Sequence, residues 1–330
     1  MSKFWNKKRV LITGANGFVG ANLAKRLMEE GAEVVTFTRG KIKKPSLLAL
    51  EKLVGKIYKQ EKGSVKDFET VNKVIKRNKV EVVFHLAAQP IVEVGEESPI
   101  ETFEVNVKGT WNVLEAARQN KVKKVIVASS THVYGDNPNL PYKEEYYPQP
   151  SRPYETSKAC ADLLAQSFAD TYGLPVEVPR FVNLYGPGDT NMTRLVPKLI
   201  ESVIEGKNPV MWDFGAVRDY LYIDDAVDAY LALVEKKLLE KKRIRVFNIG
   251  SGKPIKVVNL AKKIVKLSDS KKLKLTIKKP PAIREKEIKK QYVSVVKAEF
   301  LLSWKPKTKL LYGLKQTTDW YKKYKKEVLI

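Results

Sequence analysis

Short apolar runs, rich in β-branched residues, alternate with amphipathic segments over the first 180 residues of the chain. The run at 10–12 is typical of a strand that is buried on both faces, and further strands are predicted at 33–38, 56–60, 81–86, 124–128 and 174–180. Helical periodicity connects them, most clearly at 21–30, 100–119 and 154–172. Strands that alternate with helices in this way predict an α/β fold with a doubly wound parallel sheet over residues 1–180.

The alternation changes after residue 180. A Gly-Pro-Gly loop at 186–188 leads to predicted helices at 192–205 and 226–237 and to a strand at 246–249. We expect a smaller α/β substrate-binding cap domain in residues 181–330, built mainly from 181–218 and 258–330. Segments within about 219–257 are expected to return to the first domain.

Three glycines with a spacing of three, Gly14, Gly17 and Gly20, lie between the first strand and the first helix. Glycine lets the backbone approach a pyrophosphate closely, and the helix N-terminus offers free N–H groups and the positive end of the helix dipole. The placement therefore predicts a Rossmann-type NAD(P) site rather than an ordinary strand–helix turn. The cofactor contacts predicted in the turn are Gly14, Asn16, Gly17, Phe18 and Val19.

The end of the second strand bears on the choice between NAD and NADP. An acidic residue there would accept a hydrogen bond from the adenosine ribose 2′-hydroxyl, whereas an arginine holds the 2′-phosphate of NADP. Arg39 occupies this place, with Lys41 nearby, so the sequence favours NADP, with NAD as the alternative. The other interpretation of Arg39 is that it stacks on adenine or points into solvent.

Tyr154 and Lys158 stand four residues apart and thus share one face of a predicted helix. A free tyrosine has a pKa near 10 and is a poor base at neutral pH, so the neighbouring ammonium is expected to lower the pKa of Tyr154 by stabilising the phenolate. Ser130 follows the strand at 124–128, where its hydroxyl can share a proton with Tyr154. These three residues are the predicted catalytic group.

Composition narrows the class of protein. The net charge is +24, but the lysines are scattered and often adjoin glutamate, as in Lys286-Glu287. We interpret them as a lysine-rich surface that attracts anionic ligands, and we expect no nucleic-acid partner. No apolar run approaches the roughly 20 residues that span a bilayer, so no membrane partner is expected either.

A single cysteine, Cys160, excludes an intramolecular disulfide and fits a cytoplasmic location. The two histidines, His85 and His132, are too few for a metal cluster. His85 lies within a predicted strand and is expected to be packed in the core.

Taken together, these motifs resemble the extended short-chain dehydrogenase/reductase family, in particular its nucleotide-sugar epimerases and dehydratases. The resemblance covers almost the whole chain. It rests on Gly14-x-x-Gly17-x-x-Gly20, Leu86-Ala87-Ala88, Asn106-Val-Lys-Gly109-Thr, Ser129-Ser130, Val133-Tyr134-Gly135, Tyr154-x-x-x-Lys158, Arg180-Phe-x-Asn183-x-Tyr-Gly-Pro-Gly188, Val217-Arg218-Asp219-Tyr220 and Phe247-Asn248-Ile249-Gly250.

The resemblance implies a role for each matching residue. Lys158 would bind the nicotinamide ribose, Tyr154 would move the proton of a sugar hydroxyl, and Ser130 would orient that hydroxyl. Further cofactor contacts are implied at Ser64, Val65, Leu86, Ala87, Ala88, Gln89 and Asn106, although relatives usually have Asp in place of Ser64. Contacts with the nucleotide sugar are implied at Thr131, His132, Asn183, Arg218 and Arg284. A homodimer formed by the helices at 100–119 and 154–172 is implied as well.

The residues that separate the subfamilies favour a UDP-sugar 4-epimerase, which works through a 4-keto sugar and a tightly bound NAD(P). A 4,6-dehydratase usually has an acidic residue two or three places before the tyrosine of Val133-Tyr134-Gly135, where this chain has Thr131 and His132. His132 either transfers protons near pH 7 or lines the sugar pocket.

Three other functions stay open. Ala88-Gln89-Pro90 and the opening residues look like CDP-glucose 4,6-dehydratases, so a 4,6-dehydratase is one alternative and a 4-keto-sugar reductase/epimerase another. Outside catalysis, the alternative is a non-enzymatic regulatory protein that binds NAD(P) on the same fold.

Overall fold

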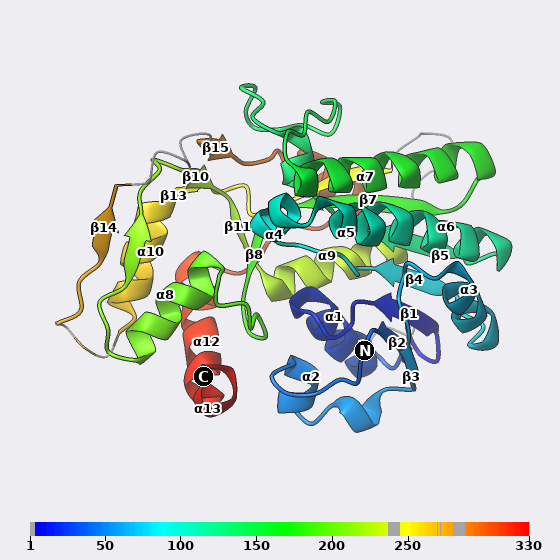
Figure 1. Cartoon of the computed structure of the whole chain (residues 1–330), viewed down its shortest axis with the longest axis horizontal. Coiled ribbons are helices and arrows are strands. Elements are labelled where there is room, and N and C mark those ends of the chain that lie inside the picture. The colour runs from blue at the N-terminus through cyan, green and yellow to red at the C-terminus, as the bar shows by residue number, and fades with distance from the viewer. Residues whose placement is uncertain (1–3, 237–244, 269, 271, 280–287, 330) are drawn as a thin grey trace.

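A parallel sheet organises the larger part of the molecule. The computed structural model describes residues 4–236, 245–268, 270, 272–279 and 288–329. Among these, eight strands form one sheet in the order β12-β7-β5-β4-β1-β2-β3, with β6 paired to β7 (Figure 1). The strands are β1 Arg9–Thr13, β2 Glu33–Thr38, β3 Lys59–Lys62, β4 Val82–His85, β5 Lys124–Val127, β6 Ser129–Ser130, β7 Val176–Phe181 and β12 Val246–Ile249.

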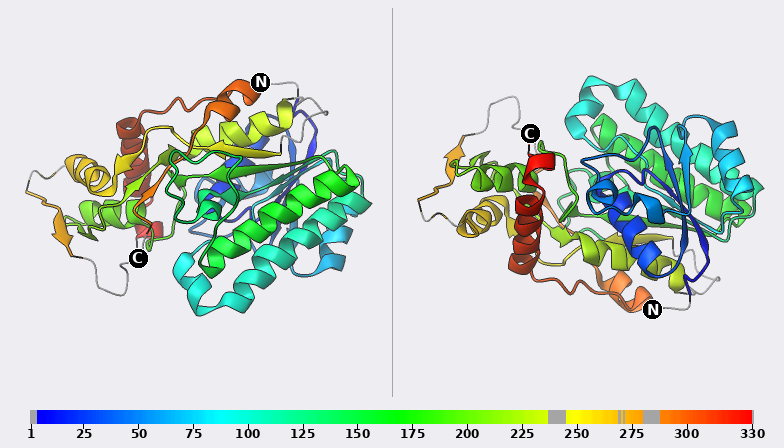
Figure 2. Two further views of the ribbon diagram at one scale, coloured as in Figure 1. Left: turned by 90° about the horizontal axis from the view of Figure 1, so that it is seen from above. Right: turned by 90° about the horizontal axis from the view of Figure 1, so that it is seen from below.

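Helices cover both faces of this sheet (Figure 2). One face carries α3 Phe68–Arg77, α6 Gly109–Gln119 and α7 Pro153–Tyr172; the other carries α1 Phe18–Glu29, α9 Ile223–Glu235 and α11 Val296–Leu302. Alternate residues of β1 pack into two separate hydrophobic cores, one on each face of the sheet. Val10 and Ile12 belong to the same core as Leu27 of α1, whereas Leu11 belongs to the same core as Val74 of α3. The predicted Rossmann-type α/β fold with a doubly wound parallel sheet is thereby confirmed.

Three small sheets lie in the other lobe, on the left of Figure 1 or at its border with the main sheet. They pair β8 Asn183–Tyr185 with β11 Tyr220–Tyr222, β9 Val210–Trp212 with β14 Thr276–Lys278, and β10 Val217–Arg218 with β13 Ile255–Lys256 and β15 Lys290–Gln291. The helices of this region are α8 Leu195–Ile204, α10 Val257–Lys266, α12 Leu310–Lys323 and α13 Lys325–Val328. Segments from distant parts of the chain thus assemble this lobe.

The structure adjusts several predicted elements. The helix predicted at 100–119 is divided into α5 Pro99–Phe103, a π-helical segment at Glu104–Lys108 and α6. Strand β12 extends the main sheet, as expected for a returning segment, but α11 also packs on β12 and α9 although its residues were assigned to the cap. The short elements α2 Leu47–Leu50, α4 Val92–Glu97 and the 3-10 turns at Val54–Lys56 and Thr131–Tyr134 had no sequence prediction.

His85 is confirmed as a packed core residue. Its side chain is buried at the end of β4, and its two ring nitrogens lie 2.8 Å from Thr13 Oγ1 and 3.1 Å from Thr110 Oγ1. Burial lowers the pKa of His85 to about 3, so the ring stays neutral at physiological pH.

A buried ion pair joins α7 to the strand ends. Asp162 of α7 accepts hydrogen bonds from Arg180 Nε at 2.8 Å and Nη2 at 3.0 Å, and from Ser129 Oγ at 2.7 Å. Arg180 also donates to the Tyr134 hydroxyl at 2.9 Å. Since neither charged group reaches solvent, each depends on the other for compensation. This pair fixes α7 relative to Ser129 and therefore relative to Ser130.

Asp162→Ala is expected to lower the free energy of unfolding by about 3–5 kcal/mol, because it leaves the Arg180 guanidinium charged and unpaired in the core. Urea denaturation followed by circular dichroism measures the change. Lys123→Ala is the control, because the Lys123 side chain is 73% exposed and its ion pair with Glu81 is worth less than about 1 kcal/mol. Equal losses of stability in the two variants would contradict this account of the core.

Candidate active site

The glycine turn brings the backbones of β1 and β4 into close approach. Gly14 has a φ of +71°, and a Cβ added there would lie 2.9 Å from Ala87 Cα and Ala87 N. Helix α1 begins directly after Gly17, and no side chain caps its N-terminus. The turn therefore leaves helix N–H groups available to an anion, and its geometry fits the pyrophosphate of a dinucleotide.

A cavity of about 340 Å³ runs from this turn to the predicted catalytic residues. Ser130 ends β6, and Tyr154 and Lys158 lie on the first turns of α7. All three line the cavity, and the hydroxyl of Ser130 is hydrogen-bonded to that of Tyr154. Pro153 is at the first helical position of α7, and the Asp162–Arg180 pair anchors the middle of the helix, so the phenol and the ammonium face the same cavity.

The expected lowering of the Tyr154 pKa is wrong for this structure. Burial raises the pKa of Tyr154, and the hydrogen bond with Ser130 and the charge of Arg194 offset only part of that rise. Lys158 does not compensate, because its ammonium donates to the Ala128 carbonyl, and burial lowers the pKa of Lys158 to about 8. A positive charge closer to the phenol is therefore needed before Tyr154 becomes a base.

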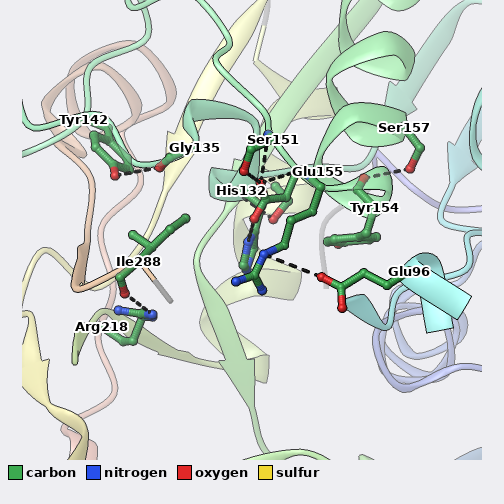
Figure 3. Close-up of polar contacts among 12 residues, drawn as sticks. Glu96, His132, Gly135, Tyr142, Ser151, Tyr154, Glu155, Ser157, Arg218 and Ile288 are labelled. Atoms are coloured by element: carbon green, nitrogen blue, oxygen red, sulfur yellow. Dashed lines mark hydrogen bonds and ion pairs between the residues drawn. The ribbon is translucent and has the colours of Figure 1, made fainter. Parts of the chain in front are cut away.

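A second cavity, of about 520 Å³, opens beside the first. His132, Asn183 and Tyr220 line both cavities, so the two spaces meet at these side chains. Arg218 lies on the wall of the larger cavity and donates to the Ile288 carbonyl at 2.5 Å and to the Lys289 carbonyl at 3.2 Å (Figure 3). The larger cavity has room for a ligand that extends away from Tyr154.

The predicted contact residues fall into groups. Those that line the smaller cavity are Phe18, Val19, Leu86, Ala88, Ser130, His132, Tyr154, Lys158 and Asn183. Asn16 and Gly17 are exposed in the glycine turn, and Arg39 is exposed after the end of β2. Thr131 is buried and lines neither cavity. Arg284 lies outside the described residues.

Three predicted cofactor contacts have structural partners of their own. Val65 is buried and its carbonyl accepts a hydrogen bond from Asn112, and Ser64 Oγ accepts from the Lys66 amide. Asn106 binds both backbone groups of Gln89, at 2.7 and 3.0 Å.

Asn106 fastens the loop after β4 to α7. It lies in the π-helical segment at Glu104–Lys108, and its Nδ2 also donates to Ser157 Oγ at 2.9 Å. Gln89 in turn donates to Thr102 Oγ1 at 3.0 Å. The π-helical segment, a feature often found at functional sites, thus supports the wall of the smaller cavity.

Two residues of the site were missed from the sequence. Glu155 follows Tyr154 and lies 3.4 Å from His132 Nδ1, and Arg194 lines the smaller cavity and pairs with buried Asp189 at 3.2 Å. The sequence signal for Glu155 was its place at the start of a predicted helix, where a glutamate caps the first turn. Arg194 had no sequence signal beyond its position before a predicted helix.

Gly14→Ala is expected to weaken binding of NAD by at least about tenfold, because the new methyl group would collide with the Ala87 backbone at a positive φ. Isothermal titration calorimetry measures the affinity, and circular dichroism checks the fold. Gly55→Ala is the matched control, since no atom lies within 4 Å of its added Cβ and Gly55 is not among the predicted cofactor contacts. Unchanged binding in Gly14→Ala would show that the turn does not hold the cofactor.

Comparisons with known proteins identify the family of this chain. A family model described as the NAD dependent epimerase/dehydratase family matches residues 10–250. The dTDP-D-glucose 4,6-dehydratase of Homo sapiens is 31% identical over 96% of this chain and 90% of its own length.

Solved structures are similar over nearly the whole chain. A UDP-glucose 4-epimerase from Thermotoga maritima, solved with UDP-glucose, has a TM-score of 0.84 and is 30% identical, covering 96% of this chain and 99% of its own. A dTDP-glucose 4,6-dehydratase from Bacillus anthracis, in complex with NAD, has a TM-score of 0.82 and is 26% identical, covering 97% and 98%. The chain therefore belongs to the NAD-dependent epimerase/dehydratase family of nucleotide-sugar enzymes, as its resemblance to the extended short-chain dehydrogenases/reductases predicted.

Proposed function

We propose that this chain is a UDP-sugar 4-epimerase that works through a 4-keto intermediate. The observation that carries the proposal is the grouping of Ser130, Tyr154 and Lys158 in a cavity that opens into a second, larger one. Such an arrangement suits a sugar at the hydroxyl pair and a nucleotide diphosphate in the larger space. The absence of a carboxylate at Thr131 and His132 favours epimerisation over 4,6-dehydration.

The side chains divide the proton transfer between them. Bound NAD supplies a hydride acceptor and donor for C4 of the sugar, and the positive charge that Tyr154 lacks in this structure. Tyr154 takes the proton of the C4 hydroxyl as a phenolate, and Ser130, already hydrogen-bonded to the phenol, orients that hydroxyl. Lys158 would hold the nicotinamide ribose when NAD is bound.

The proposed substrate is a UDP-sugar, supported by the UDP-glucose of the Thermotoga maritima relative. Asn183 lies where the two cavities meet, which suits a contact with the diphosphate. Arg218 lines the larger cavity but not the smaller one. Its hydrogen bonds to backbone carbonyls hold the guanidinium in place on the wall of the larger cavity, and a guanidinium suits contact with the same group.

The proposed cofactor is NAD rather than the NADP that Arg39 favoured. The Bacillus anthracis relative holds NAD, which does not support an NADP preference. Arg39 is exposed directly after β2, which agrees with the interpretation that it points into solvent.

A homodimer remains part of the proposal. Four large apolar side chains on α5, α6 and α7 are exposed, namely Ile100, Trp111, Leu163 and Tyr172. A second copy placed against these helices would remove the four apolar side chains from water, which is favourable.

No described helix is long and apolar enough to cross a membrane.

Tyr154→Phe is expected to lower kcat by about 10²–10⁴-fold without weakening binding of the UDP-sugar, because it removes the proton acceptor and keeps the ring. Product analysis by NMR after incubation with UDP-glucose, UDP-galactose and their N-acetyl forms measures the reaction. Tyr172→Phe, on the same helix but exposed, is the control.

The identity of the product separates the candidate functions. A C4 epimer supports the proposal, whereas a 4-keto-6-deoxy sugar with no epimer would identify a dehydratase. Turnover that survives in Tyr154→Phe would remove Tyr154 from the mechanism. A lack of turnover and of hydride transfer by the wild-type protein on every sugar would favour the non-enzymatic alternative.

Wild-type protein is expected to bind NAD more tightly than NADP, and Arg39→Ala is expected to leave NAD binding unchanged, because no acceptor on NAD needs this charge. Fluorescence titration with both dinucleotides measures the affinities, and Lys41→Ala is the charge-matched control. Tighter binding of NADP by the wild type, lost in Arg39→Ala, would restore the preference predicted from the sequence.

A further inference from the structure

Arg194 brings a guanidinium into the wall of the smaller cavity. It is the residue directly before α8, in the lobe of the small sheets, and it lines this cavity together with Ser130, Tyr154 and Lys158. Its Nη1 lies 3.2 Å from each carboxylate oxygen of Asp189. Over the described residues, neither Nε nor Nη2 of Arg194 has a hydrogen-bond partner. One nitrogen is thus held by the protein, and the rest of the cation borders the cavity.

Asp189 holds Arg194 in place and is itself buried. Its side chain is 4% exposed, and its carboxylate also accepts a hydrogen bond from the Asn191 amide at 3.3 Å. Its backbone carbonyl accepts one from the hydroxyl of Tyr321 on α12. Burial raises the pKa of Asp189, and the charge of Arg194 opposes that rise. In this ion pair the fold fixes the acid, and the acid fixes the arginine on the cavity wall.

The loop that carries Asp189 is fastened to α1, the helix that begins at the glycine turn. Asn22 Nδ2 of α1 donates to the Pro187 carbonyl at 3.0 Å. Gly188 has a φ of +91°, and a Cβ added there would lie 3.1 Å from Asn22 Nδ2 and 3.2 Å from Leu47 Cβ. The loop therefore passes α1 and α2 at a distance that leaves no room for a side chain at Gly188. This packing sets the position of Asp189 and, through it, that of Arg194.

Titratable groups face Tyr154 from several elements. Its own helix, α7, carries two of them, and α4 packs on Tyr154 so closely that a Cβ added at Gly95 would lie 3.2 Å from Tyr154 Cβ. The ring of His132 lies edge-on to the phenol, with 5.9 Å between the centroids (Figure 3). The titratable groups on these elements and on the cavity wall are Glu93 and Glu96 of α4, His132, Glu155 and Lys158 of α7, Asp189, Arg194, Tyr220 of β11 and Tyr230 of α9.

Two cations among these groups can stabilise a phenolate. The ammonium of Lys158 donates to the Ala128 carbonyl instead of the phenol. Arg194 lowers the pKa of Tyr154, whereas the neighbouring Glu155 raises it. An arginine stays charged at any pH at which the enzyme works. In this structure Arg194 is therefore the cation that acts on the phenol.

We propose that Arg194 supplies, from the lobe opposite α7, a permanent positive charge that stabilises the phenolate of Tyr154. The inference rests on the proposed function, because it assigns Arg194 a role through Tyr154 as the proton acceptor. Arg194 is a positioning residue, since it acts on Tyr154 by its charge and transfers no proton. This charge adds to the one that NAD brings when it is bound, and it is present in the protein at all times.

The first test measures the ionisation of Tyr154 without turnover. Ultraviolet absorbance of tyrosinate is followed from about pH 6 to about pH 10, with and without NAD, and each spectrum is taken against the same protein carrying Tyr154→Phe, which removes the signal of the other tyrosines. We expect about 3- to 10-fold less tyrosinate in Arg194→Gln at a given pH below the midpoint, because the stabilising charge is gone. Arg194→Lys keeps a charge and should recover most of the difference.

The control is Arg77→Gln. Arg77 also pairs with a buried carboxylate, that of Glu61, and it lines neither cavity. It should leave the Tyr154 midpoint unchanged. If the unpaired Asp189 unfolds Arg194→Gln, as seen by circular dichroism, the double variant Asp189→Asn/Arg194→Gln removes both charges and is expected to show the same upward shift.

The second test is the pH dependence of epimerisation. The acidic limb of kcat reports the base in the enzyme–substrate complex, so it should move to higher pH in Arg194→Gln. The value of kcat is then expected to fall about 3- to 10-fold below the midpoint and to recover at high pH, with NAD affinity and KM for the UDP-sugar nearly unchanged. An Arg194 that serves as a phosphate ligand would instead weaken NAD or substrate binding at every pH and leave the tyrosinate midpoint unmoved. That result would overturn the inference.

The two proposals fail in different ways. If the wild type epimerises and Arg194→Gln has the wild-type midpoint, Arg194 has no role at the phenol and the 4-epimerase stands. If the wild type neither epimerises nor transfers hydride, the proposed function is wrong. A midpoint that shifts in Arg194→Gln would still show, in that case, that Arg194 stabilises the phenolate.

Discussion

The whole site depends on the parallel alignment of β1, β4, β5 and β7. Because these strands point the same way, their carboxyl ends meet at one edge of the sheet, and the glycine turn, the loop after β4 and Ser130 all lie there. The chain order reverses direction across the sheet between β1 and β4. At this point Gly14 approaches Ala87 so closely that no side chain fits, and the space beyond it is left for a ligand.

Alignment of strands does not by itself place a helix over them. The buried pair of Asp162 and Arg180 supplies that link, since it joins the middle of α7 to β7 and, through Ser129, to β6. Tyr154 and Lys158 lie two and one turns earlier on the same helix. A small shift of α7 would separate Tyr154 from Ser130, so a charge pair that never meets a substrate controls the geometry of the proposed chemistry.

The pattern of apolar residues and the spacing of the glycines were sufficient to predict the sheet. A strand that is buried on both faces must be apolar on both, so its sequence is easily distinguished from that of a surface segment. The predicted bounds at 33–38 and 246–249 match β2 and β12. The direction in which the pKa of Tyr154 shifts could not be predicted from the sequence. It depends on the burial of the phenol and on the hydrogen bond that the Lys158 ammonium donates to the Ala128 carbonyl. Sequence spacing shows that two residues share a face but not what each side chain contacts.

For the same reason, sequence spacing does not distinguish between the reactions that this family catalyses. Searching for an acid at the positions of Thr131 and His132 assumes that a carboxylate must come from that strand end, but Glu155 reaches His132 from the first turn of α7. The fold determines which positions border the site, and a carboxylate can reach the site from either of two elements, the end of β6 or the start of α7. An epimerase from Thermotoga maritima and a human dehydratase are similar to this chain to nearly the same degree. Overall similarity therefore does not separate the two reactions, and the difference between them lies with the few side chains that line the cavities.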